Sequence, residues 1–584
     1  MFGKYFSRNK EESFYLPGEE IKIGKSCSFM GYSYEKDPLA MCKNRVAFAV
    51  LAFLLVYAVI CVRLFEVCVA PNLHGREVAE STHLKAYAQN PIKRADILDR
   101  NGTIIATSLP TVNLYATPKK ILNAKRAARE LVKVLPELKY ESVLKKLTSG
   151  SSFVYLKRNL TPSQQYQINY LGIPGLEFEN GEKRIYPHKN LFAHLIGNTN
   201  IDNKGISGIE RQLDERLTAS DIPLTLSVDA GVQDTIRVEL MAAMKKFDAV
   251  GAAAILMDVN TSEVIAMVSL PDFDPNLSAN PSSRAQFNMT TKGVYEPGSV
   301  LKVFNAAMSL ESGKVKVADR FDATQPLKLK YNVIKDYRGE NRWLSVPEIM
   351  VYSSNIGSAR MALKVGGLEQ KQFMEKIGFF DELQSLEIAE KSRPIVPKRW
   401  GEGTIATVAY GYGLAVTPMH LITAFSSVVN GGIYHAPTLL KKQNRADDGY
   451  RVISYNTSKQ MRDLLRLVVT EGSGRRANVL GYEVAGKTGT ANKLAANGKY
   501  ASKKVRTTFV ATFPVSKPKY AILVMLDEPK GTKETWGFTT SGWNTVPTTS
   551  KIISAIAPQL NVKANYDLDE LRSRRIIEAS YTKE

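Results

Sequence analysis

One apolar segment limits how this chain can fold, because it separates a short amino-terminal part from a long remainder. Residues 46–62 form an uninterrupted run of 17 apolar or neutral side chains between Arg45 and Arg63. As a helix this run spans about 25 Å, the lower limit for crossing a bilayer. The 45 residues before it are too many for the amino-terminal region of a signal peptide. We therefore predict one uncleaved transmembrane anchor over 46–68, with Lys43 and Arg45 keeping the amino terminus cytoplasmic.

The composition limits what the rest of the chain can do. At 584 residues there is room for more than one domain, and the net charge of +21 fits a membrane-surface protein near anionic polymers. No nucleic-acid-binding motif accompanies this charge. All four cysteines lie in the first 68 residues, so we expect no disulfide in the long part, and its six histidines have no metal-ligand spacing. The sequence therefore predicts no nucleic-acid partner, no metal and no cofactor.

A serine and a lysine three residues apart are the first candidate catalytic pair. Ser299 and Lys302 follow Glu296-Pro297-Gly298, and apolar residues fill most other positions from 300 to 308. A helix that is apolar nearly all round is buried, and the pair would lie on one of its faces. Pro297 and Gly298 favour a loop that ends there, which places Ser299 in the first helical turn. Ser299 is thus a candidate nucleophile and Lys302 its base.

The same tetrapeptide occurs at Ser142–Lys145, so the pattern alone carries little information. Here the apolar positions are 143, 144 and 147, which is typical of an amphipathic surface helix. We therefore predict that Ser142 faces solvent.

Ser353-Ser354-Asn355 is a second candidate motif, flanked by apolar residues on both sides. Enclosed polar atoms there are expected to have hydrogen-bond partners. Two rivals share the Ser-x-Asn form: Ser278–Asn280 lies in a polar loop, and Ser454–Asn456 precedes a helical stretch over 457–469. Helix capping explains the latter more simply.

Lys487-Thr488-Gly489-Thr490 is a third candidate motif, in an extended run with glycines. Gly489 permits another backbone to approach closely. Thr488 and Thr490 share one face at the period of a strand and could bind a carboxylate together. Runs over 507–514 and 520–526 predict neighbouring antiparallel strands.

In this order the three motifs resemble the active-site set of the penicillin-binding protein and serine β-lactamase superfamily. The runs Phe273–Asn276, after a hairpin-like run over 252–270, Tyr410–Pro418 and Ala485–Ala491 are similar to class B penicillin-binding proteins. The resemblance implies an α/β (α+β) fold with a transpeptidase domain over 223–563, an antiparallel sheet flanked by helices. It also implies an elongated pedestal over 69–222 and leaves a cytoplasmic tail at 1–45 and a charged tail at 564–584.

Four further runs resemble the pedestal, and none carries obvious chemistry: Arg94–Gly102 with a tight Asn-Gly turn, Leu171–Leu176, Arg184–Pro187 and Gly208–Glu210. Ala95 stands where the family usually has glycine. The run His194–Asp202 resembles the division-specific subgroup.

The resemblance implies a D,D-transpeptidase that cross-links peptidoglycan. Ser299 would attack the penultimate D-alanine of a stem peptide, with Lys302 as its base, and form an acyl-enzyme. Ser353 would relay a proton to the leaving amine, held by Lys487, and Asn355 would bind the substrate amide. The strand that follows Lys487 would bind substrate through Thr488, Gly489 and Thr490. The backbone N–H groups of Ser299 and Thr490 would form the oxyanion hole.

The implied partners are stem peptides ending in D-alanyl-D-alanine, β-lactam antibiotics, the membrane, a glycan polymerase of the shape-elongation-division-sporulation family and other division proteins. The catalytic domain would lie in the periplasm of a bacterium, outside the cytoplasmic membrane. Alternatives remain an elongation-specific class B enzyme and a catalytically weak scaffold of the division machinery. The sequence lacks the signatures expected of a β-lactamase, of a bifunctional glycosyltransferase or of a β-lactam sensor.

Overall fold

The computed structural model describes residues 25–29, 32–36, 38–69, 94–277, 282–330, 332–442, 449–494 and 500–566. The chain divides into two compact units, residues 1–91 and residues 92–584. Most of the predicted cytoplasmic tail, the rival motif Ser278–Asn280 and residues 567–584 of the charged tail lie outside the described residues.

The first unit contains the predicted anchor. Helix α1 (Pro38–Val69) follows an antiparallel hairpin of β1 (Lys25–Phe29) and β2 (Tyr32–Lys36). The helix begins before the predicted residue 46, because Pro38 suits a first helical position. Within the described chain, Val46–Arg63 is the one helical stretch long and apolar enough to cross a membrane, and its side chains are exposed.

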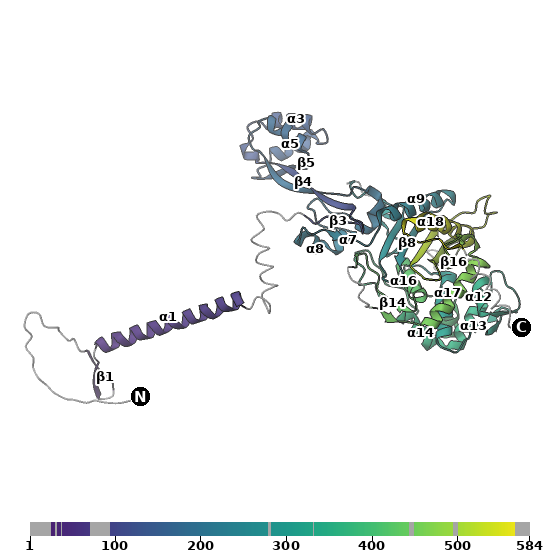
Figure 1. Ribbon diagram of the computed structural model, residues 1–584. Helices are drawn as coiled ribbons and strands as arrows, with labels where there is room; N and C mark the ends of the chain where they lie inside the picture. The colour runs from purple at the N-terminus through teal and green to yellow at the C-terminus, as the bar shows by residue number, and fades with distance from the viewer. Residues whose placement is uncertain are drawn as a thin grey trace, which may run out of the picture. The chain divides into compact units, whose positions relative to one another are not determined.

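Two long strands of the second unit form the pedestal. Strand β4 (Ile104–Ala116) pairs antiparallel with β6 (Leu176–Ile185) and connects a base to a distal lobe (Figure 1). At the base, β3 (Ile97–Leu98) pairs with β4 and with β7 (Leu224–Thr225). The remaining pedestal elements are β5 (Val154–Leu160), α3 (Ala124–Val134), α4 (Tyr140–Leu147), α5 (Pro162–Tyr170), α6 (Ala193–Ile196), α7 (Gly208–Gln212) and α8 (Asp214–Ala219).

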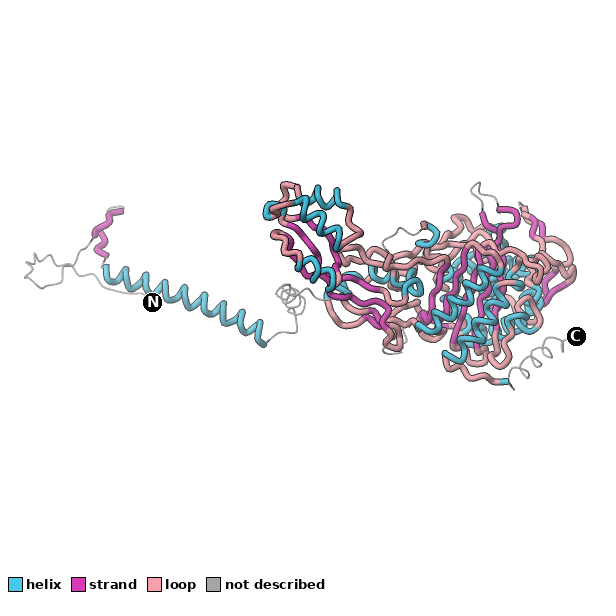
Figure 2. The backbone as a smooth tube through the Cα atoms, turned by 90° about the horizontal axis from the view of Figure 1, so that it is seen from above, coloured by secondary structure: helices cyan, strands magenta, loops and turns pink. Residues whose placement is uncertain are grey.

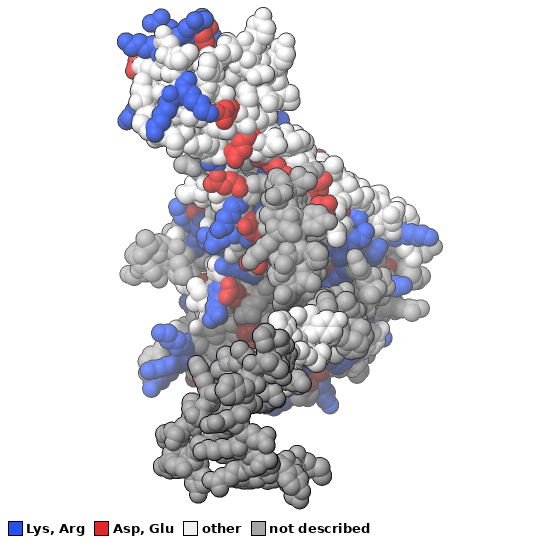
Figure 3. Space-filling view, turned by 90° about the vertical axis from the view of Figure 1, so that its left-hand side faces the viewer, with Lys and Arg blue, Asp and Glu red and all other residues white. Residues whose placement is uncertain are grey.

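The distal lobe has its own core, to which α3 and α4 contribute one apolar face each and α5 contributes Ile168. Val143 and Leu147 of α4 are buried, whereas Ser142 is exposed, which confirms the prediction of a surface helix. Lysine and arginine side chains gather on the surface of this lobe (Figure 3). The lobe therefore carries part of the positive charge noted in the sequence.

A buried cluster of charges joins the pedestal motifs at the base. Glu210 accepts from Arg184 Nε at 2.6 Å and from Arg94 Nε at 2.7 Å, and Arg94 also pairs with Asp214. Arg94 and Glu210 are almost fully buried. Buried charges require such pairing, so these residues hold three separate chain segments together. The predicted Asn-Gly turn is also present, with Gly102 at a φ of +91°.

The predicted transpeptidase domain is built on a five-stranded antiparallel sheet in the order β16-β17-β18-β8-β9. The strands are β8 (Gly251–Asp258), β9 (Val264–Leu270), β16 (Ala485–Leu494), β17 (Tyr500–Phe513) and β18 (Tyr520–Asp527). The predicted strand runs are thereby confirmed. Strand β18, from the end of the chain, pairs with β8 from the start of the domain.

Helices cover both faces of this sheet (Figure 2), which confirms the predicted architecture. Ile522, Val524 and Leu526 pack toward α9 (Ala230–Lys246) and α18 (Thr545–Gln559). Leu523 and Met525 belong to the core on the other face. This alternation follows from the period of a strand, and burial on both faces explains the continuous apolar run.

Eight further α-helices of the described domain surround the candidate site or pack near it. They are α10 (Ser283–Gln286), α11 (Leu301–Glu311), α12 (Val346–Tyr352), α13 (Asn355–Val365), α14 (Gly367–Lys376), α15 (Glu402–Val408), α16 (Pro418–Val429) and α17 (Tyr455–Thr470). Short strand pairs outside the main sheet are β10 (Arg320–Asp322) with β13 (Trp343–Ser345), β11 (Leu327–Lys328) with β12 (Val333–Ile334), and β14 (Ile433–Tyr434) with β15 (Tyr450–Arg451).

Candidate active site

Helix α11 carries the first candidate pair. Ser299 lies in a 3₁₀ turn, η4 (Gly298–Val300), which continues directly into α11. The predicted burial all round is confirmed, because ten of the eleven residues of α11 are buried. Lys302 has no exposed surface, whereas Ser299 is half-buried. Ser299 therefore keeps some exposed surface, whereas the lysine behind it has none.

The Lys302 amine contacts four oxygen atoms. Its Nζ lies 2.9 Å from Ser299 Oγ, 2.6 Å from the Ser353 carbonyl oxygen, 3.0 Å from Ser353 Oγ and 2.8 Å from Asn355 Oδ1. Lys487 Nζ donates to the same Ser353 Oγ at 2.9 Å. The three sequence motifs therefore meet at Lys302 and Ser353.

A tight turn between α12 and α13 presents the second motif. Ser353 ends α12 in the left-handed region, with φ +58° and ψ 44°, which is uncommon for a residue with a side chain. Ser354 caps α13, and its Oγ accepts from the Gly357 N–H at 3.0 Å. Such a conformation persists only where the surroundings fix it, and the two lysines and both helix ends do so here.

Strand β16 brings the third motif against the Ser299 turn. A Cβ atom on Gly489 would lie 2.7 Å from the Pro297 carbonyl oxygen, so the predicted close approach is present. Thr488 Oγ1 lies 2.6 Å from Ser473 Oγ, and Thr490 Oγ1 accepts from the Ser541 N–H at 3.2 Å. The two threonine hydroxyl groups thus have different neighbours.

Burial controls the charge of both lysines. Burial lowers the pKa of Lys302 well below its usual value, the positive Lys487 lowers it further, and Asp336 opposes the change. Burial also lowers the pKa of Lys487 to about 7. A buried ammonium group without a carboxylate hydrogen-bond partner loses its charge more readily than an exposed one, so the site favours the neutral form of both amines.

The sequence did not point to two residues of this site. Ser473 lies after α17 in a run with glycines on either side, a weak sign of a close backbone approach. Asp336 lies in the loop after β12 and carries no local signal. The rival Ser454 caps α17 by accepting from the Thr457 N–H at 3.1 Å, as predicted.

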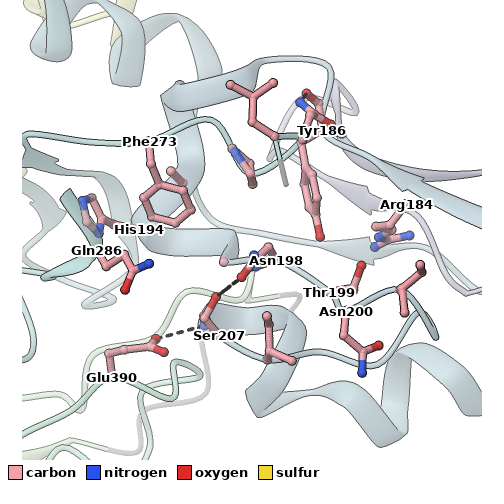
Figure 4. A pocket seen from close by; sticks show the side chains of 18 of the residues that line it. Arg184, Tyr186, His194, Asn198, Thr199, Asn200, Ser207, Phe273, Gln286 and Glu390 are labelled. Atoms are coloured by element: carbon pink, nitrogen blue, oxygen red, sulfur yellow. Dashed lines mark hydrogen bonds between the residues drawn. The ribbon is translucent and has the colours of Figure 1, made fainter. Parts of the chain in front are cut away.

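A separate cavity of about 770 Å³ lies where the pedestal meets the transpeptidase domain. Figure 4 shows His194 beside Phe273 on one side and Glu390 near Ser207 on another. The Gly208 N–H donates to Glu390 at 2.9 Å across this junction. None of the predicted site residues lines the cavity, so it is distinct from the candidate active site.

A glycine from a fourth segment supports the Ser299 turn and provides a test. Gly411 has a φ of +105°, and a Cβ atom there would lie 1.9 Å from the Gly298 carbonyl oxygen. We expect Gly411→Ala to displace Ser299 and slow acylation by penicillin by about 10²-fold, since small misplacements have effects of this size. Acylation kinetics of the folded variant would measure this.

Gly413→Ala is the matched control, because Gly413 also has a positive φ, of +84°, but a Cβ atom there meets only Thr407 Oγ1 at 3.5 Å. Gly413→Ala should show the effect of the strained backbone alone, without a collision with the Gly298 carbonyl oxygen. Equal acylation rates for the two variants would contradict a positioning effect of Gly411.

Comparison with known proteins identifies the family of this chain. Residues 252–542 match the family of the penicillin binding protein transpeptidase domain, and residues 89–238 match the penicillin-binding protein dimerisation domain. The probable peptidoglycan D,D-transpeptidase FtsI of Caulobacter vibrioides is 35% identical over 488 residues, covering 81% of this chain and 82% of the relative. The probable peptidoglycan D,D-transpeptidase PenA of Neisseria gonorrhoeae is 30% identical over 527 residues, covering 85% and 90%.

The fold is also similar to the crystal structure of a peptidoglycan synthetase from Bifidobacterium adolescentis, with a TM-score of 0.65 and 22% identity over 81% of this chain and 96% of that one. Two family matches cover both parts of the second unit, and the relatives align over most of their own length. The chain therefore belongs to the class B penicillin-binding proteins.

Proposed function

We propose that this chain is a D,D-transpeptidase that cross-links peptidoglycan stem peptides during septal cell-wall synthesis. The observation that carries the proposal is the buried Lys302 amine 2.9 Å from the hydroxyl oxygen of the half-buried Ser299. The relatives named FtsI and PenA support the substrate and the reaction.

Counting donors and acceptors supports Lys302 as the base. The Ser353 carbonyl oxygen and Asn355 Oδ1 can only accept hydrogen bonds, and Asn355 is oriented by its Nδ2, which donates to the Lys335 carbonyl oxygen. A neutral amine has two hydrogens and one lone pair. Once the two obligate acceptors take the hydrogens, the lone pair remains for a hydroxyl proton, and Ser299 Oγ lies within reach.

Acylation would then proceed without a further base. Ser299 Oγ attacks the carbonyl carbon of the penultimate D-alanine while its proton moves to Lys302. The resulting oxyanion binds the N–H groups of Ser299 and Thr490. The peptide bond breaks as the leaving amine takes a proton from Ser353, the protonated Lys302 replaces that proton while Lys487 holds Ser353, and D-alanine departs. Ser353 suits this relay because its Oγ contacts both lysine amines.

Substrate would lie along β16 as an added strand. Thr488 and Thr490 bind its terminal carboxylate, and Ser473 supports Thr488 at 2.6 Å. Asn355 binds the substrate amide, and an amine from a neighbouring stem peptide resolves the acyl-enzyme. A β-lactam enters by the same route and acylates Ser299, since the family binds penicillins.

The proposal includes a place in the cell. Helix α1 anchors the chain in the cytoplasmic membrane of a bacterium, with the amino terminus inside and the second unit in the periplasm. Its partners there are a membrane glycan polymerase of the shape-elongation-division-sporulation family and other division proteins.

Cross-linking of lipid-linked substrate by the full-length chain together with a glycan polymerase tests the activity. Cross-linked dimers that disappear on addition of penicillin are expected, and their absence would favour a scaffold. Depletion in cells tests the septal role: filaments are expected, and rounded cells would indicate the elongation-specific alternative.

A further inference from the structure

Asp336 lies outside the three motifs but contacts one of them directly. It follows β12, and its carboxylate faces the first turn of α13. Its Oδ1 accepts from the backbone N–H groups of Asn355 and Ile356, the latter at 3.0 Å, and its Oδ2 accepts from Ser354 Oγ at 2.7 Å. One side chain therefore binds three consecutive residues that begin at Ser354.

These contacts have a simple physical reason. The first N–H groups of a helix have no partner within it, and the amino-terminal end carries a partial positive charge. Asp336 satisfies the first two groups of α13, and Ser354 Oγ satisfies the third, on Gly357, at 3.0 Å. A carboxylate is the side chain best suited to both tasks.

The loop that contains Asp336 also orients the Asn355 side chain. Asn355 Nδ2 donates to the Lys335 carbonyl oxygen at 2.9 Å, which leaves Oδ1 directed at Lys302 Nζ, 2.8 Å away. Asn355 is thus held by residues 335 and 336 on one side and by the lysine on the other.

Asp336 also acts on Lys302 through its charge. The charged groups that act on this amine are Lys487 from β16 and Asp336 from the loop after β12, while η4 and the α12–α13 turn contribute the uncharged Ser299, Ser353 and Asn355. Burial and Lys487 lower the pKa of Lys302, and Asp336 raises it. Asp336 therefore opposes the two effects that neutralise the base.

We propose that Asp336 is a positioning residue for acylation, which holds Asn355 through the first turn of α13 and acts on Lys302 through its negative charge. The inference rests on the proposed function, in which Lys302 is the base for Ser299.

Acylation of the full-length chain by a fluorescent penicillin, followed over a range of pH, tests this. Asp336→Ala removes all three contacts and should slow the plateau rate by about 10²-fold, as expected for a displaced catalytic group. Asp336→Asn keeps an acceptor for the two N–H groups and removes the charge, so its plateau should fall less. Because Lys302 then loses the neighbouring anion that favours its protonated form, the acid limb of the Asp336→Asn profile should move to lower pH.

Asp322→Asn is the matched control, since Asp322, the last residue of β10, is also a carboxylate that accepts from a backbone N–H, that of Thr324 at 3.0 Å. It should leave the rate and the profile unchanged. A wild-type rate in folded Asp336→Ala, or an unmoved acid limb in Asp336→Asn, would overturn the inference. If Asp336→Ala does not fold, the position of the acid limb in the pH profile of Asp336→Asn tests the inference alone.

Labelling of Ser299→Ala in the same assay separates the two proposals. If Ser299→Ala still acylates, the proposed function fails. If it does not, and the Asp336 variants behave as wild type, only the inference about Asp336 fails.

Discussion

A Ser299→Ala variant of the full-length chain is expected to lose covalent labelling by a fluorescent penicillin completely. The variant removes the hydroxyl oxygen atom that the buried Lys302 amine contacts just before α11. Without that oxygen no ester can form with the opened β-lactam, whatever the affinity of the site. The substitution removes a single atom from a half-buried residue, so folding should be unaffected. Gel fluorescence after denaturation measures the covalent product.

The duplicate tetrapeptide provides the control for this experiment. Ser142→Ala changes the serine of the same tetrapeptide, but Ser142 is exposed on α4 of the distal lobe. It should label as the wild-type chain does. Persistent labelling of Ser299→Ala would instead point to Ser353, whose Oγ also contacts Lys302 at 3.0 Å, and peptide mapping of the adduct would identify it.

Local patterns predicted those parts of the fold that depend on local physics. The continuous apolar residues around Lys302 indicated a buried helix, and the runs that became β17 and β18 indicated strands. Ser454 preceded a periodic segment and proved to be its cap. In each case the residues that form the pattern also form the element, within about one helical turn or one strand, where side-chain periodicity determines the secondary structure.

Long-range pairings had no such signal. Nothing near Tyr520–Asp527 indicates that this strand lies beside Gly251–Asp258, nor that Arg94, Arg184 and Glu210 share one buried cluster. The resemblance to a family implied that these segments belong together, but the contacts themselves are formed by folding of the whole chain. The hairpin at residues 25–36 was likewise not expected within a cytoplasmic tail.

In the candidate site, too, residues in local motifs could be predicted from sequence and residues held by long-range contacts could not. The motif residues Ser299, Lys302, Ser353, Asn355 and Lys487 could be selected from sequence because each lies in a distinctive short context, and the structure brings them together. Their roles stay predictions until variants are measured. Asp336 could not be selected, since a single carboxylate in a loop gives no pattern, and its importance arises only from where α13 begins.

Replacement of Lys302 should have the second-largest effect, a slowing of penicillin acylation by about 10²–10⁴-fold, the usual loss for a general base. Lys302→Ala leaves Ser299 in place but without a proton acceptor at 2.9 Å. Because the alanine variant also opens a cavity in a fully buried position, Lys302→Met provides a second variant of similar volume. Time-resolved labelling, with thermal unfolding to confirm the fold, measures both.

The pH dependence distinguishes loss of a base from loss of packing. Lys302 accepts a proton only when neutral, so the wild-type rate should fall as pH drops through its pKa, which burial and Lys487 place well below that of an exposed lysine. The residual rate of Lys302→Met should lack this acid limb. Lys145→Ala, in the exposed duplicate of the motif, should retain the wild-type rate and profile. An acid limb that survives in Lys302→Met would show that another group takes the Ser299 proton, and Lys487, with a pKa of about 7 and its amine 2.9 Å from Ser353 Oγ, would be that group.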